Sequence, residues 1–140
     1  MTRDAAEVAQ ASADAMWAED KASRAMGMKV EKVGPGLAVL SMSVGDNMVN
    51  GHGFCHGGYI FTLADSTFAL VCNSGGALTV AAGADITFIT PARLGDRLVA
   101  EGRTRAAYGR SGLTDVTVTR ESDGTVIAEF RGRSRSLPGR

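Results

Sequence analysis

The fold is decided by the stretch Asn50-Gly-His-Gly-Phe-Cys-His56-Gly57-Gly58, which runs directly into Tyr59-Ile-Phe-Thr-Leu-Ala-Asp65-Ser-Thr-Phe-Ala-Leu-Val-Cys-Asn73. The first part is a glycine-rich loop, and the second is a predicted helix that Gly75-Gly76 ends. The helix is apolar on nearly all sides, which predicts that it is buried. Asp65 is the one carboxylate within it.

The start of this helix is a candidate anion or oxyanion site. Free backbone N–H groups at a helix start carry the positive end of the helix dipole. Gly57 and Gly58 would let a ligand approach that backbone closely. The alternative is that these glycines only relieve crowding where the loop meets a sheet.

Asp65 is a second candidate site residue, because an unpaired carboxylate in a buried helix costs several kcal/mol. Helical spacing places it on one stripe of small or polar side chains that can line a crevice. The stripe consists of Thr62, Asp65, Ser66, Ala69 and Asn73. It could equally be a polar seam satisfied against another helix.

The spacing of Gly57 and Asp65 predicts a dimer if both act on one carbonyl. Eight helical residues correspond to about 12 Å of rise, whereas a base or nucleophile must lie about 3 Å from the atom it serves. A two-fold related helix would then have to supply the Asp65 that works with each Gly57. Each of the two sites would lie at the subunit interface.

Two loop residues have open roles. His56 could be a general base, or it could hold the loop by bonding to backbone. Asn50 could orient a water or a carbonyl, or it could stabilise the loop through a side-chain turn. His52 is expected to be an ordinary loop residue.

The rest of the chain predicts an α+β domain, with one domain over residues 1–140. Residues 1–26 form a helical segment, with helix favoured over residues 4–26, and residues 137–140 form a tail. A short strand at residues 30–33 and a half-buried strand around Leu40 and Met42 precede the loop. Residues 79–90, 97–106, 113–121 and a strand beginning near Val126 follow the helix as antiparallel strands, with a hairpin at Asp123-Gly124. The simplest packing is a curved sheet wrapped around the central helix.

The overall charge gives no reason to expect nucleic acid or an anionic membrane as a partner. Fifteen basic and fifteen acidic residues cancel in 140 residues, of which 44% are hydrophobic. Alternate spacing of Arg131, Arg133 and Arg135, followed by Arg140, favours a solvated face of the last strand over a binding patch. No stretch is long enough to span a membrane and the N-terminus has no apolar signal core, so we expect a cytoplasmic protein.

Neither a metal nor another cofactor is expected. Cys55 and Cys72 are the only cysteines, and no second pair of Cys or His residues has the spacing of zinc ligands. We expect them to be reduced, packed thiols.

Five motifs together resemble the PaaI-type thioesterases of phenylacetate degradation. The similarity covers residues 15–136. The motifs are Asn50-Gly-His-x-x-Cys-His-Gly-Gly, Leu63-Ala-Asp65, Phe68-Ala-x-x-Cys72-Asn-Ser74, Asp85-Ile-Thr-Phe-Ile-Thr-Pro91 and Phe130-Arg-Gly-Arg-Ser. The resemblance implies the hotdog fold, dimers in which two sheets join, and tetramers built from two dimers.

The resemblance also implies roles for single residues in hydrolysis of an acyl-CoA thioester, such as phenylacetyl-CoA or hydroxyphenylacetyl-CoA. Gly57 would polarise the carbonyl, and Asp65 of the partner subunit would be the nucleophile or the base for water. Asn50 would hold the water or substrate, and His56 would position the loop.

Two further groups of residues would bind the substrate. Gly58, Thr62 and Ser66 would contact it along the helix. Arg110, Ser111 and Gly112 would bind the phosphates of coenzyme A. Two alternatives are a non-catalytic acyl-CoA-binding hotdog protein and a hotdog dehydratase or hydratase, although the histidine signatures usual in the latter are not evident.

Overall fold

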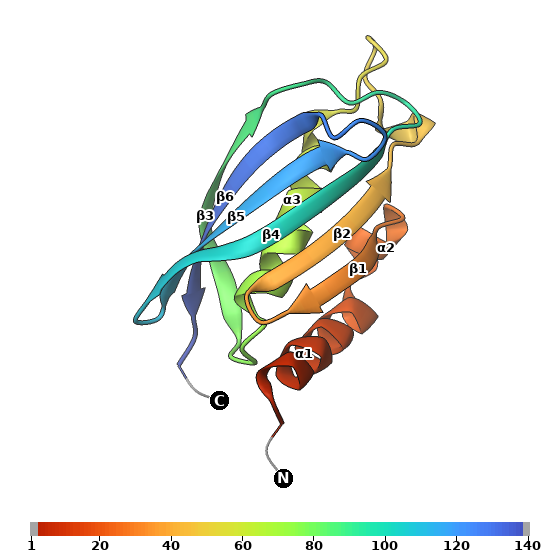
Figure 1. The fold of residues 1–140 in the computed structure, drawn as a ribbon. Helices are drawn as coiled ribbons and strands as arrows, with labels where there is room; N and C mark the ends of the chain where they lie inside the picture. The colour runs from red at the N-terminus through yellow and green to blue at the C-terminus, as the bar shows by residue number, and fades with distance from the viewer. Residues whose placement is uncertain (1–2, 139–140) are drawn as a thin grey trace.

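The computed structural model describes residues 3–138, and one helix packed inside a curved sheet dominates it (Figure 1). The elements in chain order are α1 (Ala5–Glu19), α2 (Lys21–Ala25), β1 (Lys29–Gly34), β2 (Leu37–Ser43), the 3-10 turn η1 (Asp46–Met48), α3 (Gly57–Cys72), β3 (Thr79–Phe88), β4 (Arg97–Tyr108), β5 (Ser111–Arg120) and β6 (Val126–Ser136). This succession agrees with the predicted α+β architecture. Met1 and Thr2 of the predicted N-terminal segment, and Gly139 and Arg140 of the predicted tail, lie outside the described residues.

The six strands form one antiparallel sheet in the order β1-β2-β4-β5-β6-β3. The connection that contains α3 carries the chain from β2 near one edge to β3 at the other. Figure 1 shows α3 lying across the concave side of the sheet, with α1 outside it beside β1. No helix in residues 3–138 is long and apolar enough to cross a membrane.

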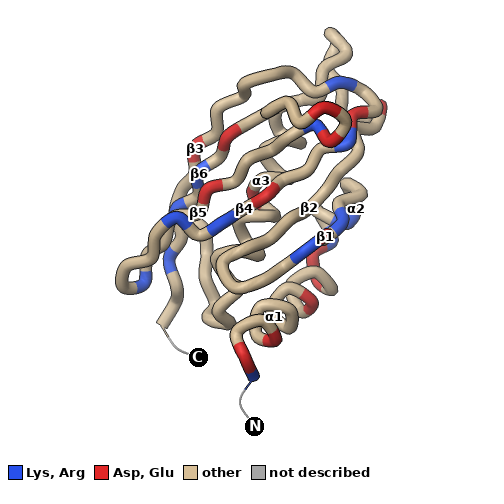
Figure 2. Tube along the Cα trace, in the orientation of Figure 1, with Lys and Arg blue, Asp and Glu red and all other residues tan. Residues whose placement is uncertain are grey.

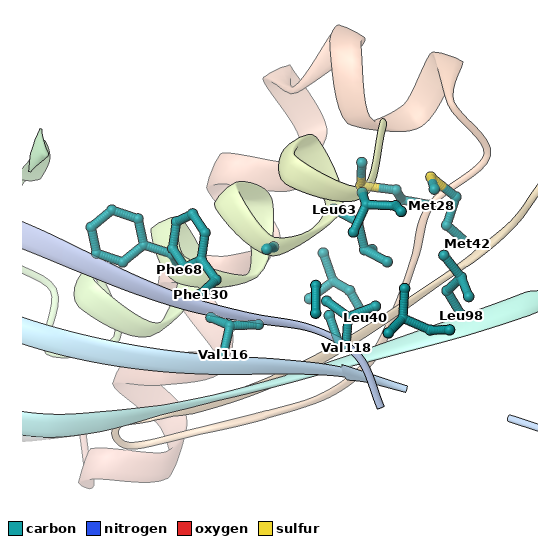
Figure 3. Packing of buried hydrophobic residues seen from close by; sticks show 14 of the residues in the cluster. Met28, Leu40, Met42, Leu63, Phe68, Leu98, Val116, Val118 and Phe130 are labelled. Atoms are coloured by element: carbon teal, nitrogen blue, oxygen red, sulfur yellow. The ribbon is translucent and has the colours of Figure 1, made fainter. Parts of the chain in front are cut away.

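The core lies between α3 and the concave face of the sheet. Leu63 and Phe68 project from α3 toward side chains of four strands (Figure 3). The sheet side of this cluster consists of Leu40, Met42, Leu98, Val116, Val118 and Phe130. Burial of these side chains holds α3 in place, because each fully buried large apolar side chain contributes about 1.5–3 kcal/mol.

Gly132 on β6 sets how closely α3 approaches the sheet. A Cβ atom at this position would lie 2.6 Å from the ring of Phe68. The Phe68 ring therefore occupies the space that the side chain of any other residue at position 132 would fill.

The predicted N-terminal helical segment is confirmed, but the helix favoured over residues 4–26 is interrupted at Asp20. The backbone of Asp20 is not helical, and its side chain accepts a hydrogen bond from the Ser23 N–H, which caps the start of α2. Short polar side chains that bond the backbone in this way favour helix starts over helix interiors. The N-terminal segment is therefore two helices that meet at Asp20.

Two strand ends also differ from the prediction. The predicted turn at residues 108–112 contains only Gly109 and Arg110, because Tyr108 pairs with Ser111 and extends both strands. At the other end of the chain, the N–H of Leu137 donates to the carbonyl of Leu78 at 2.9 Å, so the predicted tail begins with an ordered residue.

Strands β3, β5 and β6 together carry charges of both signs (Figure 2). Arg131 donates to Asp115 at 2.7 Å, and Arg133 donates to Asp85 at 2.7 Å. Both arginines are exposed. This part of the arginine run is thus a solvated face with paired charges, as the alternate spacing predicts.

Candidate active site

The loop before α3 is organised around Asn50. Its side-chain oxygen accepts hydrogen bonds from the N–H groups of His52 at 2.9 Å and Phe54 at 3.2 Å. Its backbone N–H donates to the carbonyl of Phe54 at 2.8 Å. Asn50 therefore makes the loop-stabilising turn considered from the sequence. Its side-chain amide N–H₂ has no acceptor among residues 3–138, so this donor is available for a ligand.

His56 connects the loop to the helix. It is the N-cap of α3, and its Nδ1 accepts a hydrogen bond from the N–H of Gly58 at 3.1 Å. Its own N–H donates to the carbonyl of Met48 at 2.7 Å. An accepting Nδ1 requires a neutral imidazole with its proton on Nε2. In this arrangement His56 holds the loop against the helix start.

Gly57 is the first residue of α3, and no group within residues 3–138 accepts a hydrogen bond from its N–H. The ring of Phe88, from the end of β3, lies against it. A Cβ atom at position 57 would be 2.9 Å from Cζ of that ring. Phe88 is 51% exposed. The N–H of Gly57 is therefore a free donor at a helix start, next to the ring of Phe88. Such a donor stabilises a developing negative charge.

Asp65 lies two turns further along α3 and is half-buried. Its carboxylate makes no hydrogen bond or ion pair within the described part of the chain. Burial raises the pKa of Asp65, and the negative charge of Asp20 raises it further. Loss of hydration and a like charge both disfavour the ionised form. Asp65 is thus an unpaired acid with a shifted pKa, which is a common property of functional carboxylates.

The other polar residues of the predicted stripe have partners in the chain. The hydroxyl of Thr62 donates to the carbonyl of Gly58 at 2.8 Å, and Ser66 Oγ lies 2.6 Å from Ser23 Oγ. The side chain of Asn73 bonds both the N–H and the carbonyl of Thr79, and so fixes the start of β3. Asn73 is therefore structural, and the stripe is not a continuous open crevice.

The predicted phosphate-binding residues lie at the opposite end of α3 from Gly57. Arg110, Ser111 and Gly112 border a hollow of about 190 Å³ beside the C-terminal end of the helix. Cys72 and Thr114 are among its other lining residues. Because α3 has 16 residues, its two ends are about 24 Å apart. One chain does not bring Arg110 and Gly57 together.

The thiols and metal-ligating side chains suggest no other chemistry. Burial raises the pKa of both Cys55 and Cys72 to about 11, so both thiols are protonated at neutral pH. In residues 3–138, no group of three or more His, Cys, Asp or Glu side chains is arranged to hold a metal ion.

Two features of the site were missed by sequence reasoning. The sequence predicts Phe88 on one face with Ile86, but it does not predict the contact between Phe88 and Gly57. The effect of the Asp20 charge on Asp65 was hidden, because the composition favours helix throughout residues 4–26. The pattern Asp20-Lys-Ala-Ser23 is a helix-start signal that could have revealed the break.

A single apolar helix inside a curved antiparallel sheet defines the hotdog fold. In this structure the start of that helix carries an open N–H, and its middle carries an unpaired carboxylate. These features place the chain in the class of hotdog proteins with the groups needed for acyl-transfer chemistry.

Comparison with known proteins agrees with this class. The model of the thioesterase superfamily matches residues 52–127. The acyl-coenzyme A thioesterase PaaI of Escherichia coli (strain K12) is 38% identical over 128 residues, which cover 91% of each chain. The solved structure of Escherichia coli PaaI, from the phenylacetic acid degradation operon, has a TM-score of 0.94 at 35% identity and covers 97% of this chain and 98% of that one. A Streptococcus mutans protein solved with acetyl CoA bound has a TM-score of 0.76 at 30% identity and covers 81% of this chain and 90% of its own.

The chain belongs to the thioesterase superfamily. The predicted hotdog fold and the predicted resemblance to the PaaI type are therefore confirmed.

Proposed function

We propose that this protein hydrolyses acyl-CoA thioesters to a free acid and coenzyme A. The observation that carries the proposal is the pair of groups on α3, the open N–H of Gly57 and the unpaired carboxylate of Asp65, in a member of the thioesterase superfamily. The relatives support the same substrate class, because the Escherichia coli relative is named an acyl-CoA thioesterase and the Streptococcus mutans structure holds acetyl CoA.

The reaction needs one carbonyl polarised and one proton moved. Asp65 takes a proton from water, and the water oxygen attacks the thioester carbonyl carbon. Negative charge develops on the carbonyl oxygen, where the N–H of Gly57 stabilises it; such a donor contributes about 10²–10³ in rate. The C–S bond then breaks, and Asp65 returns the proton to the departing thiolate.

A nucleophilic role for Asp65 uses the same geometry. Its carboxylate would attack the carbonyl and form an anhydride with the acyl group, and water would then hydrolyse the anhydride. Single turnover in H₂¹⁸O separates the two roles. Direct attack leaves one ¹⁸O atom in Asp65 when water hydrolyses the anhydride at the Asp65 carboxyl carbon, whereas the base role puts the ¹⁸O only in the acid product.

The site is completed by a second subunit in this proposal. The rise of about 12 Å between Gly57 and Asp65 means that two antiparallel copies of α3 must cross midway between them, at Phe61. The free edge of β3 supports the sheet-to-sheet dimer implied by the family, because its ten residues include the exposed side chains of Val80 and Phe88. An unpaired edge of this length is a template for another strand. Phe88 also brings that edge to Gly57.

The remaining predicted residues fit a substrate that lies between the subunits. Asn50 would hold the water or carbonyl through its free amide N–H₂, and His56 would keep the loop in place. Gly58, Thr62 and Ser66 would contact the acyl side. We keep Arg110, Ser111 and Gly112 as the coenzyme A phosphate site. In the crossed pair, α3 of the partner continues about 10 Å past its Asp65, so the hollow near each active site is the one that the partner supplies.

For the acyl group we propose an arylacetyl unit of the phenylacetyl or hydroxyphenylacetyl type. Aromatic side chains support this choice, because Phe88 lies on Gly57 and Phe61 packs edge-on against Phe130 at 5.4 Å between ring centroids. An aryl group of the substrate can pack against such rings in an offset or edge-to-face arrangement. We also propose that two dimers form a tetramer and that the enzyme works in the cytoplasm.

A thiol-release assay over a panel of acyl-CoAs tests the function. We expect release of coenzyme A from phenylacetyl-CoA and hydroxyphenylacetyl-CoA above that from acetyl-CoA and long-chain acyl-CoAs. Tight acyl-CoA binding without thiol release would contradict hydrolysis and point to a binding protein. Light scattering of the purified protein checks the dimer and tetramer.

A further inference from the structure

The turn of α3 that carries Asp65 is tied to the start of α2 by a chain of three side chains. Asp20 accepts hydrogen bonds from the N–H of Ser23 at 2.9 Å and from its hydroxyl at 2.7 Å. Ser23 Oγ in turn lies 2.6 Å from Ser66 Oγ, on α3 next to Asp65. Ser23 is only 2% exposed, so this contact is made in the interior.

The hydrogen bonds between these three side chains can be donated in only one direction. The Ser23 hydroxyl has a single proton, and the Asp20 carboxylate can only accept. Ser23 therefore donates to Asp20 and accepts from Ser66. The order Ser66 to Ser23 to Asp20 leaves the Ser66 oxygen with lone pairs but without a proton for a substrate.

We propose that Asp20, Ser23 and Ser66 are positioning residues for Asp65. Through this chain, α2 fixes the turn of α3 that carries Asp65 and holds a second negative charge beside it. The inference rests on the proposed function, since it assigns to Asp65 the role of base or nucleophile. Its effect is to make the Asp65 carboxylate more basic than an exposed one, which favours proton transfer and attack.

The charged surroundings of Asp65 agree with this role. Asp20 is the one charged group in residues 3–138 whose field contributes to the raised pKa of Asp65. On α3 itself, the Cys72 thiol is neutral at pH 7, because its pKa is about 11. On α2, the guanidinium of Arg24 bonds the carbonyl of Ala18 at 3.2 Å. No cation among residues 3–138 contributes to the pKa of Asp65.

Asp20→Asn separates the charge from the fold. An asparagine keeps one oxygen, which can still accept from the Ser23 N–H and cap α2. It replaces the oxygen that accepts from the Ser23 hydroxyl with an N–H₂ donor, and it removes the negative charge. We expect the acid limb of the pH profile of kcat/KM to move to lower pH, with kcat about two- to five-fold lower at the plateau. Asp4→Asn is the matched control. Asp4 caps α1 in the same way, and its charge does not contribute to the raised pKa of Asp65. This variant should match the wild-type profile.

The serines test the hydrogen-bond chain. Ser66→Ala breaks it and should lower kcat several-fold, whereas Ser66→Thr keeps the hydroxyl and should retain most of kcat. Ser12→Ala is the control for Ser23→Ala, because Ser12 also ties an N-terminal helix to α3, through the carbonyl of Asn73 at 2.9 Å. Only Ser23→Ala should lower kcat.

A titration of the Asp65 carboxyl by ¹³C NMR judges the inference without reference to activity. Asp20→Asn should lower the pKa of Asp65, and Asp4→Asn should leave it unchanged. If the titrations of wild-type protein and Asp20→Asn superimpose, the inference is wrong even in an active enzyme. If the wild-type protein releases no thiol from any acyl-CoA, the proposed function is wrong, and the titration still tests the link between Asp20 and Asp65.

Discussion

The start and the middle of α3 carry the two halves of the candidate site, and they are built in different ways. The start at Gly57 is made by near neighbours in sequence, since Asn50 shapes the loop and His56 caps the helix. The middle at Asp65 has no local partner, and its surroundings come from Asp20, 45 positions earlier in the sequence. A helix start can be completed by the residues that precede it, whereas a carboxylate in mid-helix depends on what other elements bring to it.

This difference means that Gly57 should act through its backbone and Asp65 through its charge. The largest expected effect is from Asp65→Asn, which keeps the shape of the side chain but removes the proton acceptor. We expect kcat for the preferred acyl-CoA to fall by about 10²–10⁴. Circular dichroism should show an unchanged fold. A variant with wild-type turnover would remove Asp65 from the mechanism.

At Gly57, a proline substitution tests the role of the backbone N–H, because proline has no N–H to donate. Proline is tolerated at the first position of a helix, and His56 before it has the extended backbone, with φ −62° and ψ 135°, that proline requires. Gly57→Pro should lower kcat by about 10²–10³ through loss of the donor.

Gly57→Ala is the control for that loss. It keeps the N–H but pushes its Cβ against Phe88, and adding Phe88→Ala should relieve the clash. If Gly57→Ala and Gly57→Pro were equally impaired, the effect would be steric, and the N–H would have no special role.

Substitution of Asn50 by aspartate and by alanine separates its role in stabilising the loop from its role in binding a ligand. Asn50→Asp keeps the oxygen that accepts from His52 and Phe54, but it replaces the free amide donor with a carboxylate oxygen and adds a negative charge. We expect it to retain the wild-type melting temperature and to lose roughly tenfold in kcat/KM, since one hydrogen bond contributes about 0.5–1.5 kcal/mol. Asn50→Ala should also lower the melting temperature. Full activity of Asn50→Asp would limit Asn50 to its loop role.

The smallest effect is on stability. The pKa of Asp65 is raised in the folded state. Its contribution to the free energy of unfolding is therefore fully present below the ordinary carboxyl pKa of about 3.9, and it is lost as pH rises through the folded-state pKa. Asp65→Asn should therefore gain stability relative to wild type as pH rises from 4 to 7, as measured by urea unfolding across that range. An ordinary, solvated Asp65 would give a constant difference.

The same contrast marks what the sequence could predict. The start of α3 follows from the glycine loop and the apolar run, and the sheet follows from alternating strands and the Asp123-Gly124 turn, because these are local signals. Composition favours helix throughout the N-terminal segment, but Asp20 interrupts it. The hydrogen bond from the Ser23 N–H to the Asp20 side chain, which caps α2, explains the interruption. The contacts of Phe88 with Gly57 and of Ser23 with Ser66 join elements far apart in the chain, and periodicity carries no information about such pairs.

The central claim is that each site combines Gly57 of one subunit with Asp65 of the other. Differently tagged subunits allow two heterodimers to be purified and compared. With Asp65→Asn in one subunit and Gly57→Pro in the other, a shared site leaves one of two sites intact and predicts about half of wild-type kcat per dimer. With both substitutions in one subunit and none in its partner, a shared site predicts almost no activity. The reverse pattern, an inactive first heterodimer and a half-active second one, would contradict the account and place each site within a single chain.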